Sequence, residues 1–190
     1  MKHVTLGPWK KAFEGTTYII EAARATTFDK TTKTIERATK ASSIEVIALD
    51  KQKRILLSYE YKIQQKKYVL KLPTGTIQFG ETPKQAAIRE LMEETGYKPS
   101  NIRLFRIVAP TTSLNQTHYV FIATNLKPHK IYAEEESEIK IIPTALNKVY
   151  SLIKQDKICG GETSYTLLKF YWANKKRHSK KITKKNLTIE

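Results

Sequence analysis

The segment from Thr82 to Gly96 constrains the fold of this chain more than any other part of the sequence. Thr82 is a favoured N-cap residue, Pro83 suits the first helical position, and Gln85 completes a capping box. Gly96 is the residue type that ends a helix in the left-handed conformation. These signals predict a helix over 83–95, with one apolar face that can pack on a sheet. The apolar residues of that face are Ala87, Ile88, Leu91 and Met92.

The other face of this helix carries three carboxylates. Glu90, Glu93 and Glu94 stand at i, i+3 and i+4, so their side chains are neighbours. Like charges near the C-terminal end of a helix repel one another and interact unfavourably with the helix dipole. A hard divalent cation would offset this, since Mg²⁺ binds carboxylate oxygens and keeps waters or phosphates as its other ligands. An acidic, solvated helix face is the alternative explanation for the three glutamates alone.

A loop with two glycines precedes the helix. The segment LPTGTIQFGE places Pro73, Gly75 and Gly80 ahead of Glu81, and it contains two of the seven glycines of the chain. Glycine permits backbone conformations and close approaches that other residues resist. We therefore expect the loop to fold back over the acidic face and to direct backbone groups at a bound metal and phosphate.

The chain is strongly basic, with a formal net charge of +16. Its carboxylates nevertheless gather in two places, at the helix and at 134–138. A basic protein that concentrates carboxylates is expected to hold a cation there, while the surrounding positive field attracts polyanionic substrates. Lysine and arginine are dense only at 175–185, where a solvated or flexible tail is favoured over a nucleic-acid contact.

The loop and the helix together resemble the Nudix box. Gly75 is followed by five residues and Glu81, and then by seven residues and the run RELMEETGY, which starts at Arg89 and ends at Tyr97. The resemblance implies an enzyme that hydrolyses a diphosphate bond. It also implies Mg²⁺ as the cofactor, with Mn²⁺ as the alternative ion.

The same resemblance implies roles for individual residues. The metal ligands would be Glu90, Glu93, Glu94 and the backbone carbonyl of Thr74. Arg89 would pair with Glu93 and orient it, so these two residues would carry the catalysis. Gly75 would contact the substrate.

The flanks of the box resemble the ADP-ribose pyrophosphatases within the Nudix family. The sequences PTG and GET, Pro110 and the acidic segment EEESEIKII carry this resemblance. It implies that Pro110 lies at the substrate and that a loop glutamate acts as general base or further metal ligand. Glu136 is the expected base, and Glu135 and Glu138 are the expected ligands, although a one-residue shift in the alignment exchanges these roles. A solvated acidic loop is the other interpretation.

Two positions depart from this subgroup. The run Tyr59-Glu60-Tyr61-Lys62 stands where the subgroup often has Arg-Gln-Tyr-Arg, and Lys71 stands where it usually has glutamate before Leu-Pro. Both places bind substrate in the subgroup. Tyr59, Tyr61 and Lys62 are therefore the substrate-binding candidates here, and ADP-ribose is one of several substrates to consider.

The remaining segments predict an α/β fold, a mixed sheet with helices packed against it. Strands are expected at 16–28, 31–40, 42–50, 54–62, 102–109, 118–126 and 138–142. Helices are expected from Pro143 to about Gln155 and from about Thr163 to Lys175, the latter with its aromatic residues in the core. The resemblance implies a Nudix-type α/β/α sandwich over 41–174. It also implies an N-terminal β segment at 1–40, which exchanges between the subunits of a homodimer, and leaves a basic tail at 175–190.

Together these observations favour hydrolysis of a nucleoside diphosphate linked to another group. ADP-ribose or a related ADP-sugar is the first candidate, giving AMP and a sugar phosphate. NADH or dinucleoside polyphosphate hydrolysis, removal of pyrophosphate from RNA 5′ ends, and nucleotide binding without turnover are the alternatives. The single cysteine, Cys159, and the lack of a long apolar run predict a reducing cytoplasm and no membrane contact.

Overall fold

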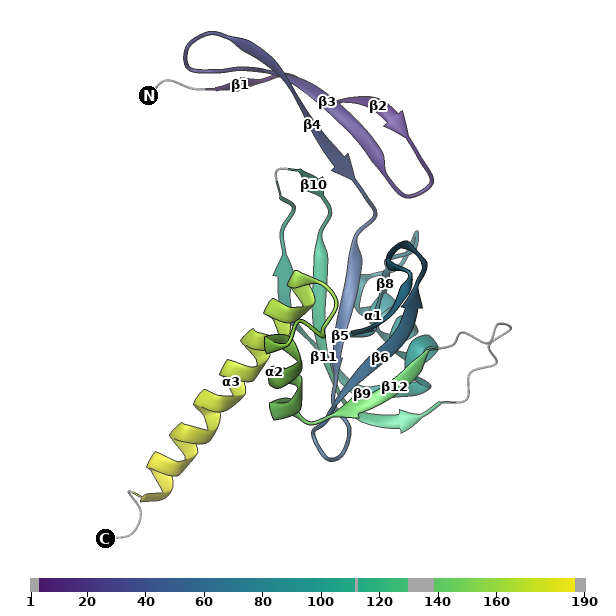
Figure 1. The fold of residues 1–190 in the computed structure, drawn as a ribbon, viewed down its shortest axis with the longest axis vertical. Coiled ribbons are helices and arrows are strands. Elements are labelled where there is room, and N and C mark those ends of the chain that lie inside the picture. Colours follow the sequence, from purple (N-terminus) through teal and green to yellow (C-terminus); the bar gives the residue numbers. More distant parts are fainter. Residues whose placement is uncertain (1–3, 112, 130–138, 187–190) are drawn as a thin grey trace.

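The computed structural model describes residues 4–111, 113–129 and 139–186, with side chains up to Lys175. Within these ranges the strands form three sheets. The N-terminal sheet contains β1 (Thr5–Leu6), β2 (Lys10–Glu14), β3 (Ile19–Thr26), β4 (Thr32–Thr39) and β10 (Leu114–Asn115). It lies at one end of the molecule, beyond the central sheet (Figure 1).

The N-terminal sheet is built around the antiparallel pair of β3 and β4, as the threonine- and isoleucine-rich sequence predicts. Asp29 organises the turn between them, because its carboxylate accepts hydrogen bonds from the backbone N–H (3.1 Å) and the hydroxyl (2.8 Å) of Thr31. Strand β10 joins the sheet from a distant part of the chain, parallel to β4, with Leu114 opposite Ala38. The N-terminal sheet is therefore connected to the rest of the molecule through both β4 and β10.

The central sheet has the order β8–β5–β11–β9. Its strands are β8 (Thr74–Thr76), β5 (Ser43–Ala48), β11 (His118–Pro128) and β9 (Tyr97–Val108). Strands β5 and β11 are parallel and the other pairs are antiparallel, so the sheet is mixed. Side chains alternate between its faces: Ile44 and Val46 contribute to one core cluster, and Ile47 to the other.

The third sheet has the order β12–β6–β7. It contains β12 (Lys140–Thr144), β6 (Ile55–Lys62) and β7 (Lys67–Lys71), with a short 3₁₀ turn over Ile63–Gln65 between the last two. Pro143 lies in β12 opposite Leu56, so the prediction that Pro143 opens a helix was wrong. The position suits proline because β12 is an edge strand, which tolerates the missing N–H.

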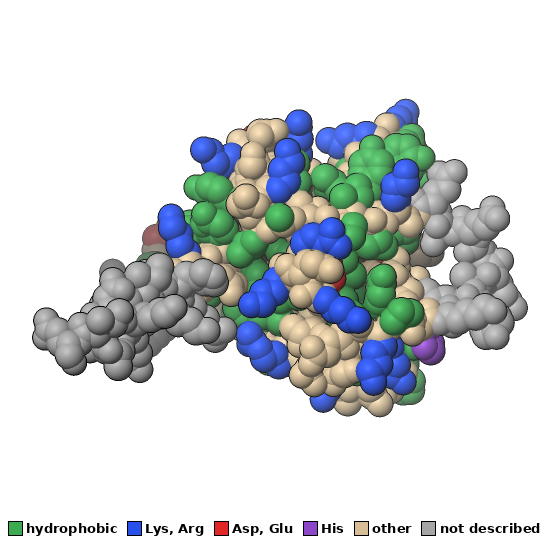
Figure 2. Space-filling model, turned by 90° about the horizontal axis from the view of Figure 1, so that it is seen from below, with side chains coloured by type: hydrophobic (Ala, Val, Ile, Leu, Met, Phe, Trp, Pro, Cys, Tyr) green, Lys and Arg blue, Asp and Glu red, His purple; other side chains and the backbone are tan. Residues whose placement is uncertain are grey.

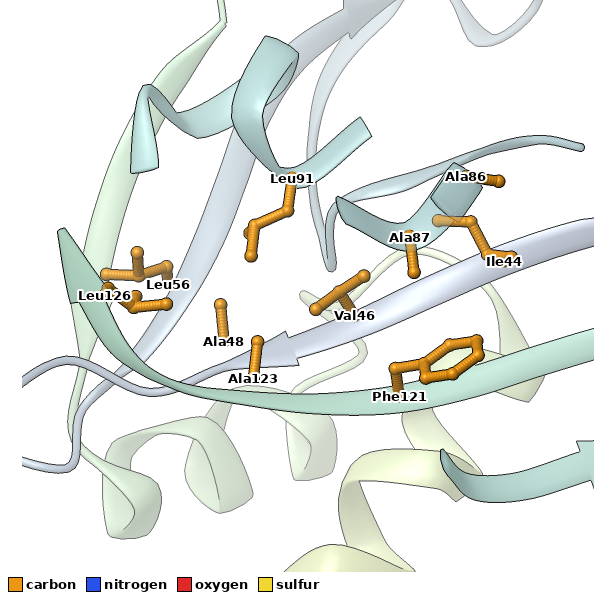
Figure 3. Close-up of a cluster of buried hydrophobic side chains, with 10 residues drawn as sticks. All are labelled: Ile44, Val46, Ala48, Leu56, Ala86, Ala87, Leu91, Phe121, Ala123 and Leu126. Carbon is orange, nitrogen blue, oxygen red and sulfur yellow. The ribbon is translucent and has the colours of Figure 1, made fainter. Parts of the chain in front are cut away.

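Helix α1 (Pro83–Thr95) covers one face of the central sheet, and α2 (Leu146–Lys154) and α3 (Gly161–Asn186) cover the other (Figure 1). Figure 3 shows the first core, in which Leu91 and Ala87 of α1 point toward Val46, Ala123 and Phe121 of the sheet. The second core packs Val149 of α2 and Leu167 and Phe170 of α3 on Ile47, Val120 and Ile122.

The predicted fold is confirmed: the molecule is an α/β/α sandwich with a mixed sheet. Helix α3 continues to Asn186, past the expected end near Lys175. Its aromatic residues are only partly in the core, since Tyr165 and Trp172 are half-exposed. The division of the chain at 40 and 174 remains a prediction. No helix in the described ranges is long and apolar enough to cross a membrane.

Candidate active site

Helix α1 is held at both ends as its sequence predicts. The Thr82 hydroxyl accepts a hydrogen bond from the Gln85 backbone N–H (3.3 Å), and the Gln85 side chain accepts one from the Thr82 N–H (2.9 Å). Gly96 adopts the left-handed conformation (φ 71°) and donates its N–H to the Met92 carbonyl. The Gly96 carbonyl then accepts the His129 N–H at 2.8 Å. The direction of the acidic face is therefore set by contacts at both helix ends.

The loop before the helix is a strand over its first part. Strand β8 pairs with β5, with Gly75 opposite Ile44, and the flanking bonds from Val46 N–H to the Pro73 carbonyl and from Ile77 N–H to the Ser42 carbonyl are both 2.9 Å. A Cβ atom at Gly75 would overlap the carboxylate of Glu90. Glycine is thus required for the close approach of this carboxylate to the backbone, as the sequence predicts.

Arg89 forms hydrogen bonds with three carboxylates of the site. Its guanidinium donates to both oxygens of Glu81 (2.7 and 2.9 Å), to Glu90 (2.8 Å), to Glu93 (3.0 Å) and to the Thr76 carbonyl (3.0 Å). The hydrogen bonds from Arg89 lower the pKa of Glu81 to about 2, and those same contacts raise the pKa of Arg89. Arg89 therefore joins the loop to the helix and restrains Glu90 and Glu93.

Glu94 occupies a different environment, in which its side chain is only 10% exposed. Its Oε1 accepts hydrogen bonds from the Lys71 ammonium (3.2 Å) and the Thr74 N–H (3.4 Å), while Oε2 is buried without a hydrogen-bond partner among the described residues. Burial raises the pKa of Glu94, and Lys71 opposes that shift. Oε1 of Glu94 therefore faces the loop, where Thr74 and Lys71 lie.

The site fits a divalent cation in its chemistry. Glu90, Glu93 and Glu94 provide carboxylate oxygens, and Gly75 leaves room for Glu90. One of these oxygens, Oε2 of Glu94, is buried with no hydrogen bond to any described residue. In the described ranges, however, no three acidic, histidine or cysteine side chains already form a metal-binding group. Arg89 and Lys71 act as the cations for these carboxylates.

A pocket opens beside the loop and contains several of the predicted residues. Its lining includes Lys62, Lys71, Thr74 and Gly75, together with Glu45 and His118. The Lys62 and Lys71 ammonium groups make this pocket suitable for an anion.

Other candidates lie apart from this pocket. Tyr59 stacks on Tyr68, with ring centroids 5.0 Å apart, and Tyr61 meets Tyr68 edge-on at 5.3 Å. Tyr59 lines a neighbouring pocket, and Pro110 is exposed between two residues, Ala109 and Thr111, that line the first one. Glu135, Glu136 and Glu138 lie outside the described residues. The substrate and base roles of this group remain predictions.

The sequence interpretation missed two groups at the pocket. One is the contact of Lys71 with Glu94 and Glu60, although Lys71 had been singled out as a departure from the subgroup. The other is Glu45, which is 1% exposed and accepts a hydrogen bond from the Thr163 hydroxyl, with His118 Nε2 3.8 Å from its second oxygen. Strand alternation could have placed Glu60 and Lys71 on one face. Only the tertiary fold brings Glu94 to Lys71 and Thr163 to Glu45.

The fold and the acidic helix belong to a known family. The NUDIX domain model matches residues 39–151, and the chain belongs to this family. Nudix hydrolases generally use divalent metal ions.

Two relatives and one solved structure show the resemblance more closely. The chain is 30% identical over 128 residues to the ADP-sugar pyrophosphatase of Mus musculus, covering 64% of this chain and 58% of that protein. It is 25% identical over 130 residues to the ADP-ribose pyrophosphatase of Bacillus subtilis (strain 168), covering 66% and 69%. A crystal structure of an ADP compounds hydrolase shares the fold with a TM-score of 0.77 at 17% identity, covering 93% of this chain and 95% of that chain.

Proposed function

We propose that this protein is a Mg²⁺-dependent pyrophosphohydrolase that cleaves a nucleoside diphosphate linked to another group. The observation that carries the proposal is the position of Glu90 and Glu94 against the strand of Gly75, with Glu93 held beside Glu90 by Arg89, within a NUDIX domain. The names of the mouse and Bacillus subtilis relatives support an ADP-linked sugar, with ADP-ribose as the first candidate. The products would then be AMP and a sugar phosphate.

The residues of the site would have different roles in this reaction. Glu90, Glu93, Glu94 and the Thr74 carbonyl would hold Mg²⁺, or Mn²⁺ in its place. When bound, such an ion neutralises diphosphate oxygens and activates a water. Arg89 holds Glu93 and Glu90 in orientation through its contacts of 3.0 and 2.8 Å, so it acts as a positioning residue. Gly75 allows the substrate and Glu90 to approach the strand backbone.

We assign the remaining roles to the acidic segment at 134–138 and to the residues expected to bind substrate. Glu136 would accept the proton of the attacking water, and Glu135 and Glu138 would add ligands. Tyr59, Tyr61, Lys62 and Pro110 would contact the substrate outside the diphosphate. We further propose a homodimer in which residues 1–40 exchange between subunits, and a cytoplasmic location, the latter supported by the single free cysteine. The basic residues from Lys175 to Asn186 belong to helix α3, so the expectation of a flexible tail there is not carried forward.

The RNA 5′-pyrophosphohydrolase alternative rests on the positive charge of the chain. Figure 2 shows lysine and arginine side chains separated from one another across the face seen from below, with apolar and uncharged groups between them. A dispersed arrangement favours a general positive field over a nucleic-acid path on this face. NADH and dinucleoside polyphosphates share the diphosphate with ADP-ribose, so they remain in the test.

The test is hydrolysis by the purified protein in Mg²⁺ of ADP-ribose, NADH, GDP-mannose, a dinucleoside polyphosphate and triphosphorylated RNA. Products are separated by chromatography. We expect AMP from an ADP-linked compound, and a kcat at least about 100-fold lower in Glu93→Gln. Glu36→Gln makes the same charge change on an exposed residue of β4 and serves as the control. Turnover of RNA alone, or no turnover of any compound, would contradict the proposal.

A further inference from the structure

Lys71 lies between two buried carboxylates. Its Nζ is 3.2 Å from Glu60 Oε1 and 3.2 Å from Glu94 Oε1. The Lys71 and Glu60 side chains are each 12% exposed, and that of Glu94 is 10% exposed. Burying an ion is costly unless it is paired. The two carboxylates therefore account for the enclosed position of the Lys71 ammonium group.

The fold explains how the three side chains meet. Strands β6 and β7 are antiparallel with Ser58 opposite Lys71 and Glu60 opposite Val69, so Glu60 and Lys71 are diagonal neighbours on one face. Glu94 reaches the same place from the last turn of α1. We refer to the space between Glu60 and Glu94 as the carboxylate cradle.

The carboxylate cradle has the properties of a cation site. Glu60 Oε1 and Glu94 Oε2 are both buried and have no hydrogen-bond partner in the part of the chain that the structure describes, although Glu60 Oε1 lies within ion-pair distance of Lys71 and Lys62. Oxygen atoms of this kind are the ligands that hard divalent ions prefer. In this chain the position is taken by the ammonium of Lys71.

The Lys71 ammonium also faces the substrate side. Lys71 lines the pocket that contains Thr74 and Gly75, where the proposed diphosphate would lie. A lysine ammonium has three N–H donors. Lys71 donates one of them to Glu94 and is paired with Glu60 by charge, so a donor is left for an oxygen of the diphosphate.

We infer that Lys71 is a fixed cation of the active site, which occupies the carboxylate cradle in place of a divalent ion and binds the substrate diphosphate. This inference rests on the proposed function for its substrate. It predicts that the native chain binds one divalent ion fewer than the same chain without the Lys71 charge.

The experiment is a titration of the metal-free protein with Mn²⁺, followed by electron paramagnetic resonance of the free ion, without substrate. We expect Lys71→Met to bind one additional Mn²⁺ per chain, or to bind its weakest Mn²⁺ about tenfold more tightly. Lys67→Met removes the same charge from an exposed position on the same strand and should change neither quantity. Lys71→Arg keeps the charge and should restore the native stoichiometry.

Two further variants identify the cradle itself. Lys71→Gln keeps hydrogen-bonding capacity without the charge, so it should also gain the ion, and it replaces Lys71→Met if that variant does not fold. Adding Glu60→Gln to either variant should remove the gained ion. Thermal unfolding of each variant establishes that the protein is folded.

Unchanged stoichiometry and affinity in folded Lys71→Met and Lys71→Gln would overturn the inference, as would an equal change in Lys67→Met. Because the titration contains no substrate, it is independent of the hydrolysis panel. A native protein that hydrolyses nothing while Lys71→Met gains a Glu60-dependent ion would refute the proposed function and keep the cation site. If the native protein hydrolyses an ADP-linked compound and Lys71→Met gains no ion, the proposed function is kept and the cation site is refuted.

Discussion

The two ends of the acidic face of α1 are neutralised in different ways. Glu90 and Glu93 share Arg89, a neighbour on the same helix, and the Glu93 side chain is 52% exposed. Glu94, one residue further on, is only 10% exposed and meets Lys71, which comes from a strand. One end is thus a network within a local segment that is exposed at Glu93, and we call it the exposed end. The other, the enclosed end, is a tertiary contact.

The difference teaches what each cation contributes. Arginine presents a planar fork of donors, so Arg89 can fix several carboxylates in defined orientations at once. Lysine is a compact point charge on a flexible stem, so Lys71 supplies charge more than orientation. The exposed end is therefore organised for geometry, and the enclosed end for charge.

Removing Arg89 should have the largest effect on stability. Arg89→Leu leaves Glu81, Glu90 and Glu93 without their shared donor, and we expect the free energy of unfolding without metal to fall by about 2 kcal/mol. Mg²⁺ should restore part of the loss, because it offsets the repulsion among the carboxylates. Urea unfolding with and without Mg²⁺ measures both. Arg103→Leu, on the exposed side of β9, is the control, and an equal loss there would contradict the geometric role of Arg89.

Gly75→Ala tests the exposed end through sterics alone. The added methyl group overlaps the Glu90 carboxylate, which must rotate away from β8. We expect Mn²⁺ affinity to fall by about tenfold, since a displaced ligand costs on the order of 1–2 kcal/mol. Gly80→Ala introduces strain at φ 81° but meets no atom within 4 Å, so it separates backbone strain from loss of the ligand. Similar losses in both variants would remove the steric explanation.

The smallest effect should be the change in the free energy of unfolding with pH that the two ends produce in metal-free buffer. Hydrogen bonds from Arg89 hold the pKa of Glu81 at about 2, so Glu81 stabilises the fold above its unfolded value of 4.5, and this contribution is lost as pH falls through about 2. Burial raises the pKa of Glu94, so its contribution has the opposite sign and is lost as pH rises through the raised value.

Urea unfolding between pH 2 and pH 7 distinguishes the two signs. Glu81→Gln should be less stable than the native protein at pH 6, with the difference closing toward pH 2. Glu94→Gln should gain stability relative to the native protein as pH rises above 4.5. If both variants lost stability relative to the native protein as pH rises, or both gained it, the two ends would not differ as their contacts indicate.

The sequence predicted the local parts of the site closely. The ends of α1 are fixed by Thr82, Pro83, Gln85 and Gly96, which act on backbone groups within four residues of themselves, so no tertiary information is needed. The contact of Arg89 with Glu93 is likewise local, one helical turn apart. The requirement for glycine at position 75 also arises within the segment of the loop and α1, because the carboxylate that approaches Gly75 belongs to Glu90.

The parts that the sequence did not predict depend on contacts between distant residues. Pro143 has the properties of a helix start as well as those of an edge strand, and its pairing with Leu56 decides between them. Lys71 and Glu94 are 23 residues apart, and their meeting requires β7 and α1 to be placed together. The amphipathic pattern of α3 fades before Lys175, so it could not indicate that the helix continues to Asn186.

The pairing of β8 with β5 has a consequence for the entropy of binding. In many phosphate sites a mobile loop becomes ordered around its ligand, and the lost freedom, about 1–2 kcal/mol per residue fixed, weakens the affinity. Here the backbone from Pro73 to Ile77 is already hydrogen-bonded to the central sheet. A ligand at Thr74 and Gly75 would therefore meet a backbone whose ordering was completed when the protein folded. The remaining entropic cost of binding would come from the ligand's own loss of freedom and from the ordering of exposed side chains such as Lys62.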